Sequence, residues 1–230
     1  MINMKIMKKK LFFCALLFMT VILSGCQNEE TYSCNQEIDE WVHDNLNEIR
    51  AMSRSTWNDL DESVKRATFR AFTQQQKINF WKDKLNEVLQ MEWNDEEKAH
   101  IAIILNYIDE NPQIFDRTKE RTDEEQEEID IFFYKWVEDA KAQLNWDMPL
   151  ITGIVATGNT LVDKSGKIRI STQSRALVKS SGEECDCEID QYMRWCLTMD
   201  CETSRTGCKA SEDGCGFFWD YPCDGTCGGV

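Results

Sequence analysis

Eight cysteines stand close together near the end of the chain, and their thiols are its most chemically capable groups. They are Cys185, Cys187, Cys196, Cys201, Cys208, Cys215, Cys223 and Cys227. Thiols at this density form disulfides in an oxidising compartment or bind a metal such as zinc. Cys223 and Cys227 have the spacing of a zinc-binding pair, but Cys185 and Cys187 do not, and residues 183–230 contain no histidine. We therefore expect disulfide bonds and no metal site, with a pairing that the sequence alone does not define.

The size of the cysteine-rich region, residues 183–230, supports the same interpretation. A segment of about 45 residues buries too little apolar surface to fold without help, so covalent bonds must restrict its unfolded state. The sequence therefore predicts a small disulfide-rich C-terminal domain.

The start of the chain has the pattern of an export signal. Three lysines at 8–10 precede an uncharged apolar run, Leu11–Leu23, which is too short to span a bilayer permanently. The run ends in Leu23-Ser24-Gly25-Cys26, which resembles the lipobox of bacterial lipoproteins. The resemblance implies that residues 1–25 are removed and that Cys26 receives a diacylglyceryl group on sulfur and an acyl group on nitrogen. Several acyl chains would hold the protein on a membrane.

Residues 26–34 are then an acylated tether. Gln27-Asn28-Glu29-Glu30 resembles the acidic tag that directs some bacterial lipoproteins to the outer surface, although an unstructured acidic tether remains the alternative. We expect a lipid-anchored protein of the bacterial cell envelope, at the outer membrane, and surface-exposed if the tag acts. With Cys14 removed and Cys26 acylated, Cys34 makes the remaining number of cysteines odd, so it either stays free or bonds another chain.

Residues 35–148 have the periodicity of amphipathic helices. Apolar residues recur at spacings of three and four in about five segments, which predicts a mainly α fold with an N-terminal helical domain. Three segments begin with capping-box pairs. The pairs are Thr73 with Gln76, Asn94 with Glu97, and Thr122 with Glu125. Asn111-Pro112 is expected to end the fourth helix. Most of the tryptophans in this region fall on apolar faces, which favours core positions over a ligand groove.

Residues 149–182 differ in composition, because bases outnumber acids and small polar residues are frequent. Asp163-Lys164-Ser165-Gly166, between two apolar stretches, could close a short hairpin. A flexible linker is the alternative, and the sequence does not decide between them. In either case this basic segment is the expected site of proteolysis.

Two parts of the cysteine-rich region carry a family resemblance. Cys185-Asp186-Cys187 and the run Gly214-Cys215-Gly216-Phe217-Phe218-Trp219-Asp220-Tyr221-Pro222-Cys223 resemble the fulvocin C-related family of cysteine-rich bacteriocins. The resemblance covers about residues 183–227 and implies a peptide that disturbs bacterial membranes. Candidate membrane or partner contacts are Phe217, Phe218, Trp219 and Tyr221. The alternative is that these rings pack on the disulfides as a miniature core. Residues 183–230 hold 11 acids and three bases, which disfavours contact with anionic membranes.

Composition and motifs argue against other functions. The net charge of −15 disfavours nucleic-acid binding. His43 and His100 are the only histidines, and no phosphate loop, nucleotide fingerprint or metalloprotease motif is present, so we expect neither catalysis nor a cofactor other than the lipid.

The sequence thus predicts an exported lipoprotein with a bacteriocin-like module, a precursor whose target is another cell's membrane. The alternative is a surface lipoprotein whose module binds a protein or glycan without toxicity. A third hypothesis is an immunity or maturation factor for a related toxin.

Overall fold

The computed structural model describes residues 30–33, 35–170, 201–202, 211–223 and 226–227. The predicted signal peptide, the lipidation site Cys26, and Cys34 lie outside these residues, as do Cys185, Cys187, Cys196 and Cys208. The chain divides into two compact units, Met1–Thr31 and Tyr32–Val230. The second unit contains nearly all of the described residues.

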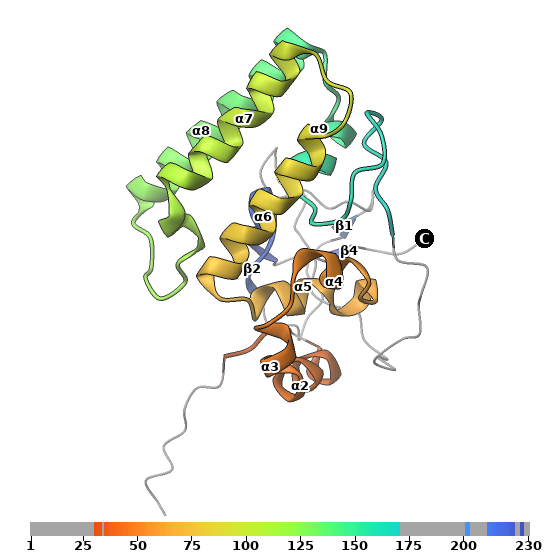
Figure 1. Ribbon diagram of the computed structural model, residues 1–230. Coiled ribbons are helices and arrows are strands. Elements are labelled where there is room, and N and C mark those ends of the chain that lie inside the picture. Colours follow the sequence, from red (N-terminus) through yellow and green to blue (C-terminus); the bar gives the residue numbers. More distant parts are fainter. Residues whose placement is uncertain (1–29, 34, 171–200, 203–210, 224–225, 228–230) are drawn as a thin grey trace, which may run out of the picture. The chain divides into compact units, whose positions relative to one another are not determined.

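The described part of this unit is mainly helical, as predicted, with eight α-helices (Figure 1). They are α2 (Gln36–Asp44), α3 (Leu46–Ile49), α4 (Arg54–Asn58), α5 (Glu62–Arg70), α6 (Gln74–Leu89), α7 (Asp95–Glu110), α8 (Asp123–Leu144) and α9 (Met148–Val155), with a 3₁₀ helix η1 (Pro112–Phe115). The short helix α4 and the helix α9 were not predicted. No helix within the described ranges is long and apolar enough to cross a membrane.

Local side-chain chemistry fixes where the long helices begin. All three predicted capping boxes are present, at the starts of α6, α7 and α8. In each box the side chain of the first residue accepts a hydrogen bond from the backbone N–H of the fourth residue. The side chain of the fourth residue in turn accepts one from the backbone N–H of the first. Helix α7 ends at Glu110, before Pro112, as expected.

The core lies between these helices and contains most of the tryptophans, as predicted. Trp57 and Trp81 are fully buried, and Phe80 packs edge-on against both. Helices α7 and α8 lie side by side (Figure 1) and are joined by the stacked rings of Tyr107 and Phe132.

Residues 149–170 depart from the linker interpretation. Pro149 occupies the first turn of α9, where its missing N–H is harmless, and the side chain of Asp147 caps the helix. A hairpin follows, with a bridge between Leu161 and Ile168 and a turn at Gly166, whose φ of 81° suits glycine. The described part of the segment thus contains a helix and a short hairpin, and residues 171–182 lie outside the described ranges.

The described C-terminal residues form two short antiparallel pairs of strands. Strand β1 (Cys201–Glu202) pairs with β4 (Thr226–Cys227). Strand β2 (Ser211–Cys215) pairs with β3 (Tyr221–Cys223) in an irregular register. A 3₁₀ turn, η2 (Phe217–Trp219), connects β2 to β3. This β2–η2–β3 hairpin holds the aromatic run of the family resemblance.

Candidate functional site: an aromatic segment inside the helical unit

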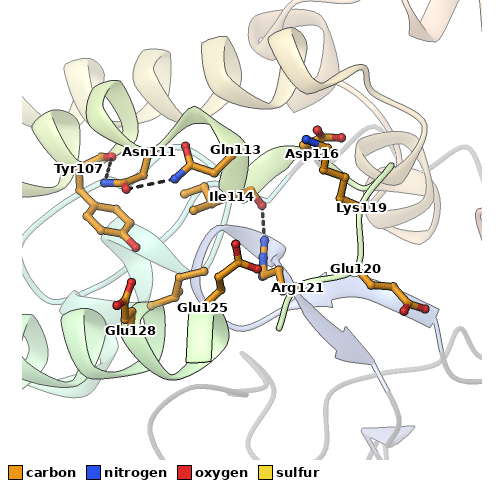
Figure 2. A pocket seen from close by; sticks show the side chains of 11 residues that line it. Tyr107, Asn111, Gln113, Ile114, Asp116, Lys119, Glu120, Arg121, Glu125 and Glu128 are labelled. Atoms are coloured by element: carbon orange, nitrogen blue, oxygen red, sulfur yellow. Dashed lines mark hydrogen bonds between the residues drawn. The ribbon is translucent and has the colours of Figure 1, made fainter. Parts of the chain in front are cut away.

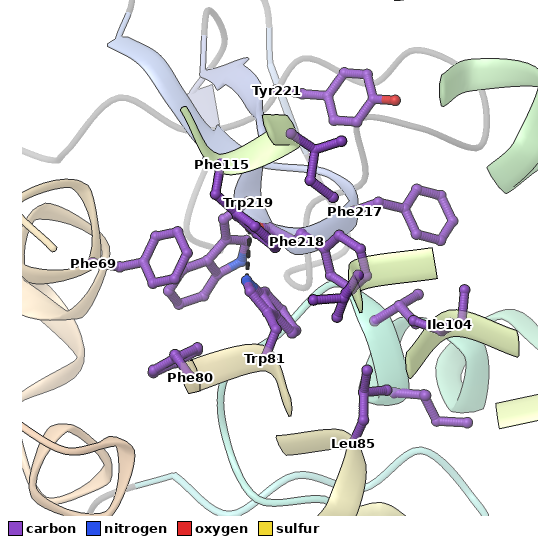
Figure 3. Close-up of a cluster of buried hydrophobic side chains, with 14 of the residues drawn as sticks. Phe69, Phe80, Trp81, Leu85, Ile104, Phe115, Phe217, Phe218, Trp219 and Tyr221 are labelled. Carbon is purple, nitrogen blue, oxygen red and sulfur yellow. Dashed lines mark hydrogen bonds between the residues drawn. The ribbon is translucent and has the colours of Figure 1, made fainter. Parts of the chain in front are cut away.

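The aromatic segment, residues 214–221, lies in the core of the helical unit (Figure 3). Its four rings are almost inaccessible, with exposures of 3% for Phe217, 1% for Phe218, 6% for Trp219 and 5% for Tyr221. From the sequence, these rings were expected at a membrane or partner surface, or in a miniature core packed on the disulfides. The structure instead packs them against helices that are distant in sequence, because those helices offer far more apolar surface than so short a hairpin.

Trp219 is at the centre of the packing. Its ring centroid lies 5.4 Å from that of Trp57 and 5.2 Å from that of Phe69, with a third contact to Trp81. Its indole Nε1 donates a 2.9 Å hydrogen bond to the carbonyl oxygen of Ala156. The buried polar atom of the indole is therefore satisfied, as burial requires.

Phe218 and Phe217 extend the contact toward α6 and α8. Trp81 stacks at an angle on Phe218, and its Nε1 donates a 2.9 Å bond to the Phe218 carbonyl oxygen. Phe217 stacks nearly parallel on Phe133, with ring centroids 4.4 Å apart. Helices α6 and α8 thus bind both the side chains and the backbone of the segment.

The backbone of the segment adopts an uncommon conformation. Phe218 and Trp219 both have φ of 55°, in the left-handed region that bulky residues rarely enter. Such a residue costs about 1–3 kcal/mol and persists only where its surroundings fix it. The helical unit supplies those surroundings through the two indole hydrogen bonds.

Charged groups hold the end of the segment. The buried carboxylate of Asp220 pairs with Arg117 and with Arg121, each at 2.6 Å. The Tyr221 hydroxyl donates a 2.6 Å hydrogen bond to Asp130. Burial first, and then the Asp130 carboxylate, raise the pKa of Tyr221 well above its usual value. These contacts tie the segment to α8 and to the loop before it.

A pocket of about 270 Å³ adjoins this end of the segment, between η1 and α8 (Figure 2). Arg121 forms part of its wall and also donates to the Ile114 carbonyl oxygen. The lining is mostly polar, with the acids Asp116, Glu120, Glu125 and Glu128 and the bases Lys119 and Arg121. Ligand pockets are usually larger, about 300–1,000 Å³, and mostly apolar, so we assign no ligand to this one.

A cluster of buried cations fixes the backbone next to Trp219. Lys84 Nζ donates to the Asn159 carbonyl oxygen, and Arg54 Nε donates to that of Gly158 at 3.0 Å. Lys65 Nζ donates to Asn159 Oδ1 at 2.9 Å. This cluster was not predicted from the sequence, because lysines on amphipathic helices normally face solvent. The three cations fix the backbone at residues 158 and 159. This backbone follows Ala156, whose carbonyl oxygen accepts the hydrogen bond from the Trp219 indole.

Burial lowers the pKa of Lys84 to about 7, with Arg54 as the next largest cause. The pKa of lysine in the unfolded chain has its ordinary value of 10.5, so the unfolded state binds more protons than the folded state between pH 7 and pH 10.5. Stability should therefore rise with pH in that window. We expect the free energy of unfolding to increase by about 3 kcal/mol from pH 7 to about pH 9.5.

Chemical unfolding at several pH values tests this expectation with two matched variants. Lys84→Met should remove most of the increase. Lys82→Met should keep it, because Lys82 is partly exposed and pairs with Asp109 on the surface. The titration ends near pH 9.5 because two tyrosines, Tyr107 and Tyr221, have pKa values in the folded protein above the ordinary tyrosine pKa of about 10. Above pH 10 these tyrosines lose their protons more readily in the unfolded state, which lowers the stability of the fold. An equal slope in both variants would contradict the assignment.

The histidines have structural surroundings. His100 stacks on Trp136, and burial lowers its pKa. His43 lies 3.5 Å from Asp39, one turn earlier in α2. Over the part of the chain that is described, no group of three His, Cys, Asp or Glu side chains could hold a metal.

Cys215 is the one predicted disulfide cysteine whose side chain the described residues include. It is fully buried and disulfide-bonded. The backbones of Cys201, Cys223 and Cys227 lie in the short strands. Comparisons with protein-family models, with curated proteins and with solved structures found no match.

Proposed function

We propose that the protein is an exported bacterial lipoprotein, anchored through acylated Cys26, whose cysteine-rich region stays attached and serves as a binding module for a protein or glycan at the cell envelope. The observation that supports attachment is the burial of the aromatic segment in the helical core. The export signal and the lipobox resemblance support the anchor.

Energetics favour attachment over release. Fully burying an aromatic side chain contributes about 1.5–3 kcal/mol, and four rings must leave the core before the C-terminal region can separate. Separation would also break the two ion pairs that Asp220 forms with Arg117 and Arg121. A cut in residues 171–182 would therefore give a nicked protein whose two parts remain associated.

The second candidate function is the precursor of an antibacterial peptide. The observation that favours it is that the helical unit covers the same four rings which the fulvocin C-related resemblance assigns to a target membrane. Covering them would keep the precursor harmless to the cell that makes it. Activation would then need extraction of the segment as well as cleavage.

The anchor is tested by growing cells with an alkyne-labelled fatty acid. We expect label on the wild-type protein and its loss in Cys26→Ala, because the thioether requires the Cys26 thiol. Cys14→Ala is the matched control and should keep the label, since Cys14 lies in the part of the signal that is removed. Label on Cys26→Ala equal to the wild type would refute the proposed anchor.

Mass spectrometry of the culture medium and the membrane fraction then separates the two functions. The binding-module proposal predicts the intact acylated chain, or a nicked form that stays on the membrane. A free peptide that begins near Ser180–Glu183 and inhibits bacterial growth would favour the precursor instead.

A further inference from the structure

Lys164, at the tip of the hairpin that follows α9, places its ammonium group in a site that other elements build. Its Nζ lies 4.3 Å from the centre of the Trp93 ring and donates a 2.8 Å hydrogen bond to Glu97 Oε2. Trp93 comes just before α7, and Glu97 lies in the first turn of that helix. An aromatic face and a carboxylate together provide the two interactions that recognise a primary ammonium ion.

The shape of this site does not depend on the lysine, because each of the receiving groups has another partner. The indole Nε1 of Trp93 donates a 2.6 Å hydrogen bond to the Val88 carbonyl oxygen. The Glu97 carboxylate accepts hydrogen bonds from the Asn94 backbone N–H at 2.8 Å and from Trp146 Nε1 at 3.4 Å. The rings of Trp93 and Trp146 also pack together, with centroids 5.5 Å apart. The receiving groups are therefore fixed whichever cation lies between them.

The hairpin, in turn, does not depend on the Lys164 side chain to keep its position. The Val162 backbone N–H donates a 2.7 Å hydrogen bond across the hairpin to the Lys167 carbonyl oxygen. Gly166 packs so closely on the first turn of α9 that a Cβ there would collide with the helix backbone. The Lys164 side chain itself is 41% exposed. It can therefore leave the site while the hairpin stays in place.

Charge favours the exchange of one ammonium group for another over an empty site. The side chain of Glu97 is only 12% exposed beneath Lys164. Departure of the lysine would leave this carboxylate without the cation that pairs with it, which is costly for a mostly buried charge. Asp95 and Glu96, which are exposed in the same helical turn, attract a replacement cation.

We propose that this site binds the ammonium group of a lysine side chain from a partner protein, and that Lys164 is a built-in competitor which occupies it in the free protein. The contacts specify a primary ammonium, because the hydrogen bond to Glu97 needs an N–H that a quaternary ammonium lacks. Lysine fits because its long stem carries the charge away from the chain that presents it, as Lys164 does. The site is separate from the proposed binding module, and it is the same whether or not Cys26 is acylated.

The test uses the whole protein with the substitution Lys164→Ala, which removes the competitor and keeps the receiving groups. Binding of Nα-acetyl-lysine methylamide is followed by the NMR signals of the Trp93 and Trp146 indole N–H groups. We expect saturable shifts in Lys164→Ala and binding at least about tenfold weaker in the wild type, where Lys164 competes as a tethered ligand. Lys167→Ala is the matched control and should behave as the wild type, because it removes a lysine of the same hairpin and leaves the competitor in place.

Two matched compounds and a second variant test the chemistry of recognition. The norleucine analogue has no charge and the trimethyl-lysine analogue cannot donate a hydrogen bond, so each should bind to Lys164→Ala at least about tenfold more weakly. Adding Glu97→Gln should abolish the binding of the lysine compound, and glutamine can still close the capping box of α7. The proposal is wrong if Lys164→Ala shows no saturable shift, if the three compounds bind equally, or if binding persists without the Glu97 carboxylate.

Discussion

Trp219→Ala is expected to lower the free energy of unfolding of the whole helical unit by about 3–5 kcal/mol. The ring packs between Trp57 and Phe69, and the helices cannot close the space that it leaves. The change also removes the hydrogen bond to the Ala156 carbonyl oxygen and leaves a buried acceptor unpaired. Denaturant unfolding followed by helical circular dichroism measures the loss.

The matched control for this prediction is Ile131→Ala on α8. Its side chain is 44% exposed, so truncation should change stability by no more than about 0.5 kcal/mol. Helices that unfold at the same denaturant concentration with and without the Trp219 ring would show that the aromatic segment is not part of their core.

Asp220→Asn is expected to destabilise the unit by about 3 kcal/mol, because removal of one partner leaves two guanidinium groups without their counter-ion. The carboxylate is only 5% exposed, and Arg121 is 17% exposed. Arg117 is 32% exposed, so water will replace part of its lost interaction. This is why the expected loss is at the low end for a buried pair.

Asp109→Asn provides the comparison for a surface pair. Asp109 and Lys82 are joined at 2.6 Å, but both side chains reach solvent, so the loss should be below about 1 kcal/mol. Equal effects of the two substitutions, measured by the same unfolding experiment, would mean that the Asp220 contacts do not hold the segment.

The helices could be predicted from the sequence because their signals are local. A capping box such as Thr73 with Gln76 satisfies the backbone of its own first turn, whatever the helix packs against. The apolar faces follow the helical period, and residues such as Leu85 and Ile104 are buried as that period implies. Helix α9 was not predicted, because the change in composition placed residues 149–182 in a linker or hairpin, whereas Pro149 lies in the first turn of this helix.

The candidate site could not be predicted, because it depends on contacts between distant parts of the chain. Nothing near Trp219 in the sequence indicates that its ring will meet Trp57 and Phe69. The burial of Lys84 was equally hidden, since its acceptor is a backbone carbonyl far along the chain. Local sequence patterns determine where a helix begins and ends and which of its faces is apolar. They do not determine which distant residues that face will pack against in the folded protein.

Nuclear Overhauser measurements on protein with selectively labelled aromatic rings test directly whether the aromatic segment packs in the helical core. If the aromatic segment packs in the helical core, cross-peaks are expected from the Trp219 indole to the rings of Trp57 and Phe69, whose centroids lie 5.4 and 5.2 Å away. Cross-peaks from Trp219 only to residues 183–230, with none to the helices, would contradict it and restore a separate cysteine-rich module.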